Sequence, residues 1–112
     1  MIKFSSRLFS LFILSTSFLF LLISNLFAGS PTKVGFVYLH TKEDFGWTMA
    51  HERGAQMVKK HFGKDVKITE VNNVPEGPDS TRVIRELAKQ GNEIIFTTSF
   101  GYMEPTLKVA KE

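Results

Sequence analysis

The hydrophobic and polar residues of this chain follow two strand patterns. Residues 33–39 and 93–98 contain nearly continuous apolar runs of β-branched and aromatic side chains. Such runs are typical of strands that are buried on both faces of a parallel sheet. Residues 66–71 instead alternate apolar with polar side chains, so this strand buries one face and is expected at or near a sheet edge. The pattern predicts three strands.

A helical repeat follows the first strand. Residues 45–62 place apolar and small side chains on one stripe, and a glycine at position 63 fits a C-terminal stop. The stripe predicts the face of this helix that packs on the sheet. Its members are Trp47, Ala50, Gly54, Met57, Val58 and His61.

Two further helices follow the second and third strands. The second helix has its own apolar stripe, made of Val83, Ile84, Leu87 and Ala88. Asp79 or Ser80 is expected to cap this helix, and Gly91 is expected to end it. The third helix is predicted to begin near Met103, with Pro105 in its first turn, where proline is tolerated.

The resulting order, βαβαβα, predicts an α/β fold with a parallel sheet and right-handed crossovers. The half-buried second strand belongs outside the first strand, and the third strand belongs on its other side. The sequence therefore predicts the strand order 2-1-3, which is the first part of a doubly wound sheet. The third strand has an interior sequence and the chain stops within a helix, so we expect these residues to begin a longer protein.

The first 28 residues differ in composition from the rest. They hold six of the 11 Phe residues, and no acidic residue occurs before Glu43. A basic start with Lys3 and Arg7, an apolar run over residues 8–23 and a small-residue exit at Ala28 are typical of a secretory signal peptide. Residues 1–28 are therefore interpreted as a signal peptide cleaved after Ala28. The alternative is an uncleaved membrane anchor, since the apolar run is near the minimum length for a span.

Charge and cysteine content exclude several classes of protein. Without Lys3 and Arg7 the chain carries 12 basic and 11 acidic residues, so it has no basic excess that would indicate nucleic-acid binding. It has no cysteine, which excludes a disulfide scaffold, a thiol nucleophile and an N-terminal lipid-modified cysteine.

Candidate binding residues follow the first and third strands. In a parallel sheet, ligands bind beyond the carboxyl ends of the strands, where the winding reverses. Aromatic side chains in the two loops that meet there favour a planar ligand, because rings stack on aromatic faces. Each of these aromatics could instead be a packing residue, and Asp44 could be only a helix cap. The candidates are Asp44, Phe45, Gly46, Trp47, Ser99, Phe100, Gly101 and Tyr102.

Signals for catalysis are weak. His51 and Glu52 begin an HExxH pattern, but Ala55 stands where the second histidine of a zinc site is required. No GxSxG motif surrounds Ser99, and no phosphate-binding glycine loop follows the first strand. The sequence therefore predicts no catalytic residues, no metal site and no cofactor.

Three segments together carry a family resemblance. They read DFGW at residues 44–47, NVPEG at 73–77 and TTSFGYM at 97–103. From residue 33 to 112 the chain resembles the basic membrane protein family, the PnrA-like substrate-binding proteins of ABC transporters. The resemblance implies a periplasmic binding protein of type I, in which two Rossmann-like lobes close on a ligand. Residues 29–112 would be an incomplete N-terminal lobe.

The resemblance also implies a function. Family members capture purine nucleosides or nucleobases outside the cytoplasm and deliver them to an ABC permease in the membrane. The eight candidate residues match the family's binding segments, while the NVPEG loop is expected to make less direct contact. The open alternative is a membrane-anchored sensor of the same fold that signals to a partner protein. A secreted hydrolase is a third possibility, for which no pair of nucleophile and base can be assembled.

Overall fold

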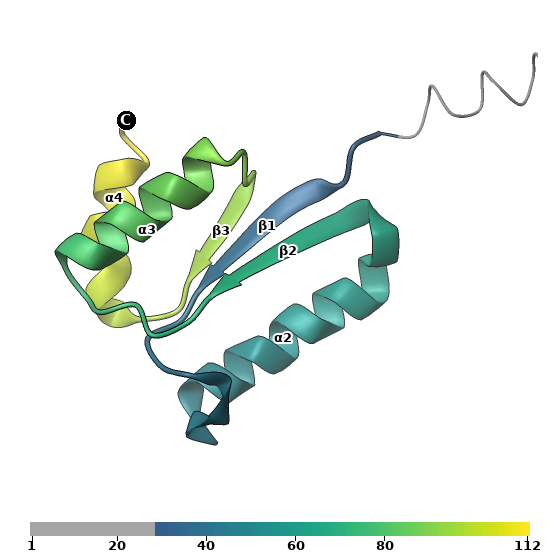
Figure 1. Ribbon diagram of the computed structural model, residues 1–112, viewed down its shortest axis with the longest axis horizontal. Helices are drawn as coiled ribbons and strands as arrows, with labels where there is room; N and C mark the ends of the chain where they lie inside the picture. Colours follow the sequence, from purple (N-terminus) through teal and green to yellow (C-terminus); the bar gives the residue numbers. More distant parts are fainter. Residues whose placement is uncertain (1–28) are drawn as a thin grey trace, which may run out of the picture. The chain divides into compact units, whose positions relative to one another are not determined.

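The computed structural model describes residues 29–112, and the predicted signal segment lies outside these residues. Three strands, three α-helices and three short 3-10 turns follow one another in the alternating order predicted from the sequence (Figure 1). In chain order they are β1 (Thr32–Val37), η1 (Lys42–Asp44), α2 (Trp47–Phe62), η2 (Gly63–Asp65), β2 (Val66–Val71), α3 (Pro78–Lys89), β3 (Ile94–Thr97), η3 (Phe100–Tyr102) and α4 (Met103–Val109).

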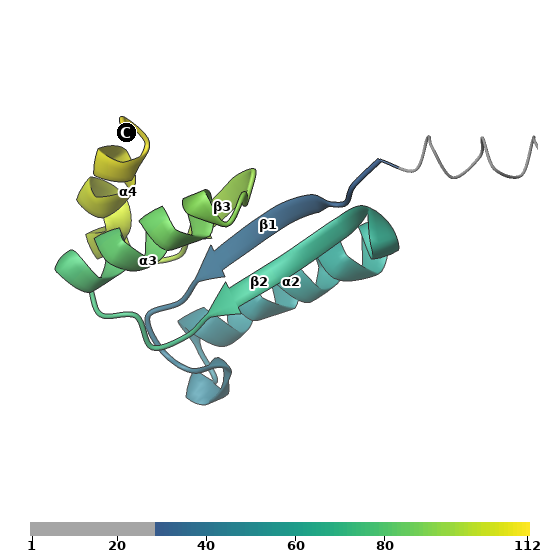
Figure 2. The ribbon, with the colours of Figure 1, turned by 45° about the horizontal axis from the view of Figure 1, so that its top comes forward.

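The sheet has the order β2-β1-β3, and both pairings are parallel. Val34 of β1 pairs with Ile68 of β2 on one side and with Ile94 of β3 on the other. Helix α2 covers one face of the sheet, and α3 and α4 cover the opposite face (Figures 1 and 2). The predicted α/β class and the 2-1-3 order are confirmed.

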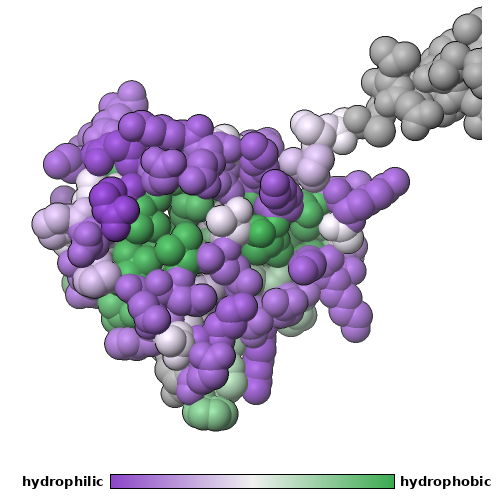
Figure 3. All heavy atoms as spheres, viewed as in Figure 1, coloured by the Kyte–Doolittle hydropathy of each residue, from purple (hydrophilic) through white to green (hydrophobic). Residues whose placement is uncertain are grey.

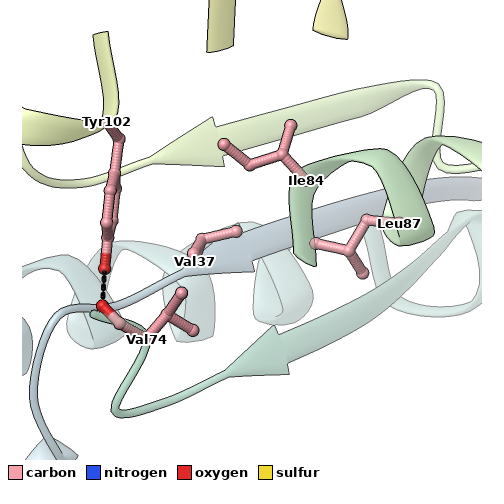
Figure 4. Close-up of a cluster of buried hydrophobic side chains, with 5 residues drawn as sticks. All are labelled: Val37, Val74, Ile84, Leu87 and Tyr102. Atoms are coloured by element: carbon pink, nitrogen blue, oxygen red, sulfur yellow. Dashed lines mark hydrogen bonds between the residues drawn. The ribbon is translucent and has the colours of Figure 1, made fainter. Parts of the chain in front are cut away.

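The central strand β1 supplies both halves of the core. Side chains alternate across a strand, so Val37 faces α3 and α4, whereas Phe36 and Tyr38 face α2. Val37 packs with Val74, Ile84, Leu87 and Tyr102 (Figure 4). Phe36 and Tyr38 pack with Val34 and Ala55. Burial on both faces explains why the sequence of β1 is apolar without interruption.

The predicted sheet-facing stripe of α2 is mostly wrong, although its member Val58 is half-buried and borders the same groove as Val34 and Phe96 of the sheet. The buried residues of this helix are Thr48 and Ala55, while Trp47 is 63% exposed and Met57 is 72% exposed. Each buried residue is one position after a predicted one, which corresponds to a rotation of about 100° around the helix axis. The sheet decides the orientation, because the large rings of Phe36 and Tyr38 leave room for a small residue such as Ala55.

The start of α3 also differs from the prediction. The helix begins at Pro78 and its N-cap is Gly77, whose φ of 92° few other residues adopt. The Ser80 hydroxyl does not cap the helix but donates a 2.8 Å hydrogen bond back to the Gly77 carbonyl. The expected stop at Gly91, which has a φ of 81°, is confirmed.

In the described residues, β3 lies at the edge of the sheet although its sequence is apolar. Ile94 and Phe96 are each 47% exposed. They border a groove of about 390 Å³ on the α2 side, and the other lining residues are Thr32, Val34, Val58, Phe62, Asp65 and Val66. Figure 3 has the view of Figure 1, which faces the opposite, β2 edge of the sheet, and there too apolar side chains lie in a band between the hydrophilic side chains of the helices above and below.

Candidate ligand-binding edge of the sheet

Trp47 connects the loop after β1 with the loop after β3, the two loops that carry the predicted binding residues. It is the first residue of α2, and its indole Nε1 donates a hydrogen bond to the carbonyl oxygen of Thr98, just after β3. The ring also meets the edge of the His51 ring at a centroid distance of 4.7 Å. Most of the indole nevertheless stays exposed. The hydrogen bond therefore fixes the ring in place without burying it.

Phe45 precedes this helix in an unusual backbone conformation. Its φ of 52° lies in the left-handed region, which bulky residues rarely adopt. Its side chain is 83% exposed, so burial of the ring does not explain the conformation. Gly46 follows as the N-cap of α2, and Asp44 ends the preceding turn η1. Strained residues of this kind are often found at binding sites.

A charged cluster anchors the same loop to the sheet. The Lys42 ammonium group, at the start of η1, donates to the Glu70 carboxylate of β2 over 3.2 Å. The buried Tyr38 hydroxyl donates to the other oxygen of Glu70 over 3.1 Å. Burial, followed by the negative charge of Glu70, raises the pKa of Tyr38 well above its usual value. Tyr38 is therefore a neutral hydrogen-bond donor at physiological pH.

The loop after β3 is held by a residue from a third loop. The Glu76 carboxylate accepts hydrogen bonds from the Ser99 hydroxyl and from the Gly101 backbone N–H, the latter over 3.1 Å. Phe100 lies between these two residues in the chain and is 88% exposed. Glu76 belongs to the NVPEG segment that connects β2 with α3. All three loops at the carboxyl edge of the sheet are therefore connected.

Tyr102 differs from the other three aromatics because its ring is fully buried in the core. Its hydroxyl donates a 2.6 Å hydrogen bond to the Val74 carbonyl, as Figure 4 shows. Burial, and then the nearby charge of Glu76, raises the pKa of Tyr102 to about 12. Tyr102 supports the edge from beneath, while the rings of Phe45, Trp47 and Phe100 are exposed.

The candidate residues lie in the loops after β1 and β3, as the sequence predicts, but sequence reasoning missed the residues that hold these loops. Glu76 and Glu70 contact these loops from positions 25 and 28 residues away in the chain. No local pattern marks such a contact. The one signal in the sequence is the NVPEG segment, which includes Glu76 but gives it no specific role.

Comparison with known sequences decides the family. Residues 31–112 match the family described as ABC transporter substrate-binding protein PnrA-like. The chain belongs to this family. The PnrA-like proteins are solute-binding proteins rather than enzymes, and substrate-binding proteins of ABC transporters work outside the cytoplasm.

Two curated relatives and one solved structure fit this assignment. A purine-binding protein of Brucella abortus (strain 2308) is 47% identical over 85 residues, which cover 76% of this chain and 24% of the relative. A protein of Haloferax volcanii named for glucose binding by an ABC transporter is 32% identical over 84 residues, covering 75% of this chain and 21% of the relative. The chain thus spans about a quarter of the length of these relatives.

The solved structure is an ABC transporter solute-binding protein from Conexibacter woesei DSM 14684. It is similar with a TM-score of 0.65 at 19% identity, covering 71% of this chain and 26% of that chain. This likeness supports the fold. Within residues 29–112, no helix is both long and apolar enough to cross a membrane. The same residues contain no cluster of three potential metal-ligating side chains.

Proposed function

We propose that the full-length protein captures a purine nucleoside or nucleobase and delivers it to an ABC permease. The observation that carries this proposal is the Trp47–Thr98 hydrogen bond, which fixes an exposed ring where the loops after β1 and β3 meet. A planar heterocycle gains stacking energy on such a ring. The ligand would lie in a cleft between two lobes, one of which includes the described residues.

The proposed contacts come from both loops. Phe45, Trp47 and Phe100 offer exposed aromatic faces, and Tyr102 supports the edge from the core. Backbone and small polar groups would complete the contacts, and these belong to Asp44, Gly46, Ser99 and Gly101.

The relatives that match this chain are named for two different ligands, a purine and a glucose. Both kinds of ligand can pack on aromatic rings, so stacking alone does not separate them. The purine-binding relative is 47% identical and the glucose-binding relative is 32% identical over similar lengths. The higher identity supports a purine ligand.

Calorimetric titration of the full-length protein tests this proposal. Adenine, adenosine, guanosine and glucose would be titrated into protein from which bound ligand was removed by mild unfolding and refolding. We expect one or more of the purines to bind with saturable heat and glucose to give none. Binding of glucose without binding of any purine would overturn the proposed ligand class and leave the family assignment intact.

Export follows from the same proposal, with residues 1–28 acting as a signal peptide. We expect the exported protein to begin at Gly29, because the apolar run ends in small residues that signal peptidase accepts. N-terminal sequencing or intact-mass measurement of exported protein checks this. A full-length product that stays in the membrane fraction would instead support the anchored sensor.

A further inference from the structure

Glu76 makes contacts that neither the family assignment nor the proposed binding loops require. It lies in the loop between β2 and α3, yet one carboxylate oxygen accepts from both Ser99 and Gly101, after β3. These two donors flank Phe100 in the chain. A carboxylate that accepts two hydrogen bonds from one short segment restricts the backbone of that segment.

The backbone of Gly101 fits closely around this carboxylate. A Cβ atom built on Gly101 would lie 2.1 Å from the carboxyl carbon of Glu76, and the three nearest atoms all belong to Glu76. Atoms cannot approach so closely, so any larger residue at position 101 must displace the carboxylate. Gly101 is not in the left-handed region, so alanine would be compatible with its backbone. The absence of a side chain at position 101 therefore serves the contact with Glu76.

A second bond ties the same two loops together below the surface. The Tyr102 hydroxyl donates to the Val74 carbonyl, two residues before Glu76 (Figure 4). The loop after β2 thus holds the segment 99–102 by two contacts. Glu76 holds it at the protein surface, and the Val74 carbonyl holds it in the core. Phe100 is the large side chain of this segment that is 88% exposed, so packing does little to fix its position.

We infer that Glu76 is a positioning residue for ligand binding, which holds the segment 99–101 so that Phe100 is presented at the carboxyl edge of the sheet. This role rests on the proposed function, since Phe100 is one of its contacts. Glu76 itself need not touch the ligand. Its carboxylate acts as a geometric acceptor, so glutamine, which keeps one acceptor oxygen, should largely replace it.

The first measurement tests whether Glu76 holds the loop and needs no ligand. Hydrogen exchange of the Gly101 amide would be followed in the full-length protein, in Glu76→Ala and in Glu76→Gln. We expect exchange to be faster in Glu76→Ala and close to the unsubstituted rate in Glu76→Gln. An unchanged rate in Glu76→Ala would overturn the inference.

The second measurement tests positioning through the affinity for adenosine, used as the probe. Glu76→Ala should raise the dissociation constant about three- to tenfold, as expected for loss of an exposed hydrogen-bonded contact. Gly101→Ala should act similarly, because its Cβ displaces the carboxylate. In the Glu76→Ala background, Gly101→Ala should add less than about a twofold effect, since the obstructing carboxylate is gone. Gly54→Ala is the matched control, because this site on α2 is exposed and the new Cβ would meet nothing within 4 Å besides its chain neighbours and the adjacent helix backbone.

Measuring Glu76→Ala in a Phe100→Ala background shows whether the loss of adenosine affinity depends on the Phe100 ring. If Glu76 positions Phe100, Glu76→Ala should change adenosine affinity less than about twofold once the ring is absent. A full effect in that background, or unchanged affinity in both single variants, would overturn the positioning role while the proposed function stands. If the unsubstituted protein binds other purines but not adenosine, the positioning role of Glu76 in adenosine binding is overturned. Failure of every purine would overturn the proposed function and the positioning role together.

Discussion

Replacing Tyr102 with alanine is expected to lower the free energy of unfolding by about 3–5 kcal/mol, the range for truncating a large buried aromatic. The ring is fully buried and packs with Val37, Ile84 and Leu87. It also holds the loop after β2 through the Val74 carbonyl. Urea unfolding of the apo protein measures the loss. Tyr102→Phe keeps the ring and removes only the hydroxyl, so it should cost about 1–3 kcal/mol through the unpaired carbonyl.

The pH dependence of stability gives a second test of the same residue. Because the fold raises the pKa of Tyr102 to about 12, the neutral phenol is favoured in the folded state. Its contribution is fully present below the unfolded pKa of about 10 and is lost as the pH rises from there toward the folded value. We therefore expect stability to fall less steeply above about pH 10 in Tyr102→Phe than in the unsubstituted protein. Tyr38, whose pKa is also raised, is present in both proteins. Equal slopes would show that Tyr102 is not held as a neutral donor.

Replacing Trp47 with alanine is expected to weaken purine binding by about 1–3 kcal/mol, the range found for stacking of a base on an aromatic ring. This corresponds to an increase of about five- to 150-fold in the dissociation constant. The ring is 63% exposed, so the stability of the apo protein should fall by only about 1 kcal/mol, mainly through loss of the hydrogen bond to Thr98. A fully buried tryptophan would instead cost about 3–5 kcal/mol of unfolding free energy.

Two further variants separate stacking from packing. Trp47→Phe keeps an aromatic face but cannot donate to Thr98, so it should retain more affinity than Trp47→Ala. Phe62→Ala, at the far end of α2 and 49% exposed, removes an aromatic ring away from the carboxyl edge and should leave purine affinity unchanged. Unchanged affinity in Trp47→Ala, together with a large loss of apo stability, would leave Trp47 as a packing residue.

The sequence by itself determined the architecture of the described residues. The unbroken apolar run of β1 required burial on both faces, and the structure places Val37 in one half of the core and Phe36 and Tyr38 in the other. The alternation in residues 66–71 required one solvated face, and β2 is an edge strand of the described sheet. Strand periodicity is a local property with a period of two, so it can be read without knowing the partners.

Only the tertiary structure decided which side chains are buried and which distant residues they contact. The orientation of α2 depends on the shape of the sheet beneath it, and that surface turned Thr48 and Ala55 inward instead of Trp47 and Gly54. The roles of Trp47 and Glu76 depend on partners 51 and 25 residues away in the chain. Tyr102 is buried although Phe100, two residues earlier, is exposed, because the Tyr102 ring packs in the core and the Val74 carbonyl accepts from its hydroxyl. Such contacts arise only when parallel strands bring their carboxyl ends to one edge, and local periodicity carries no information about them.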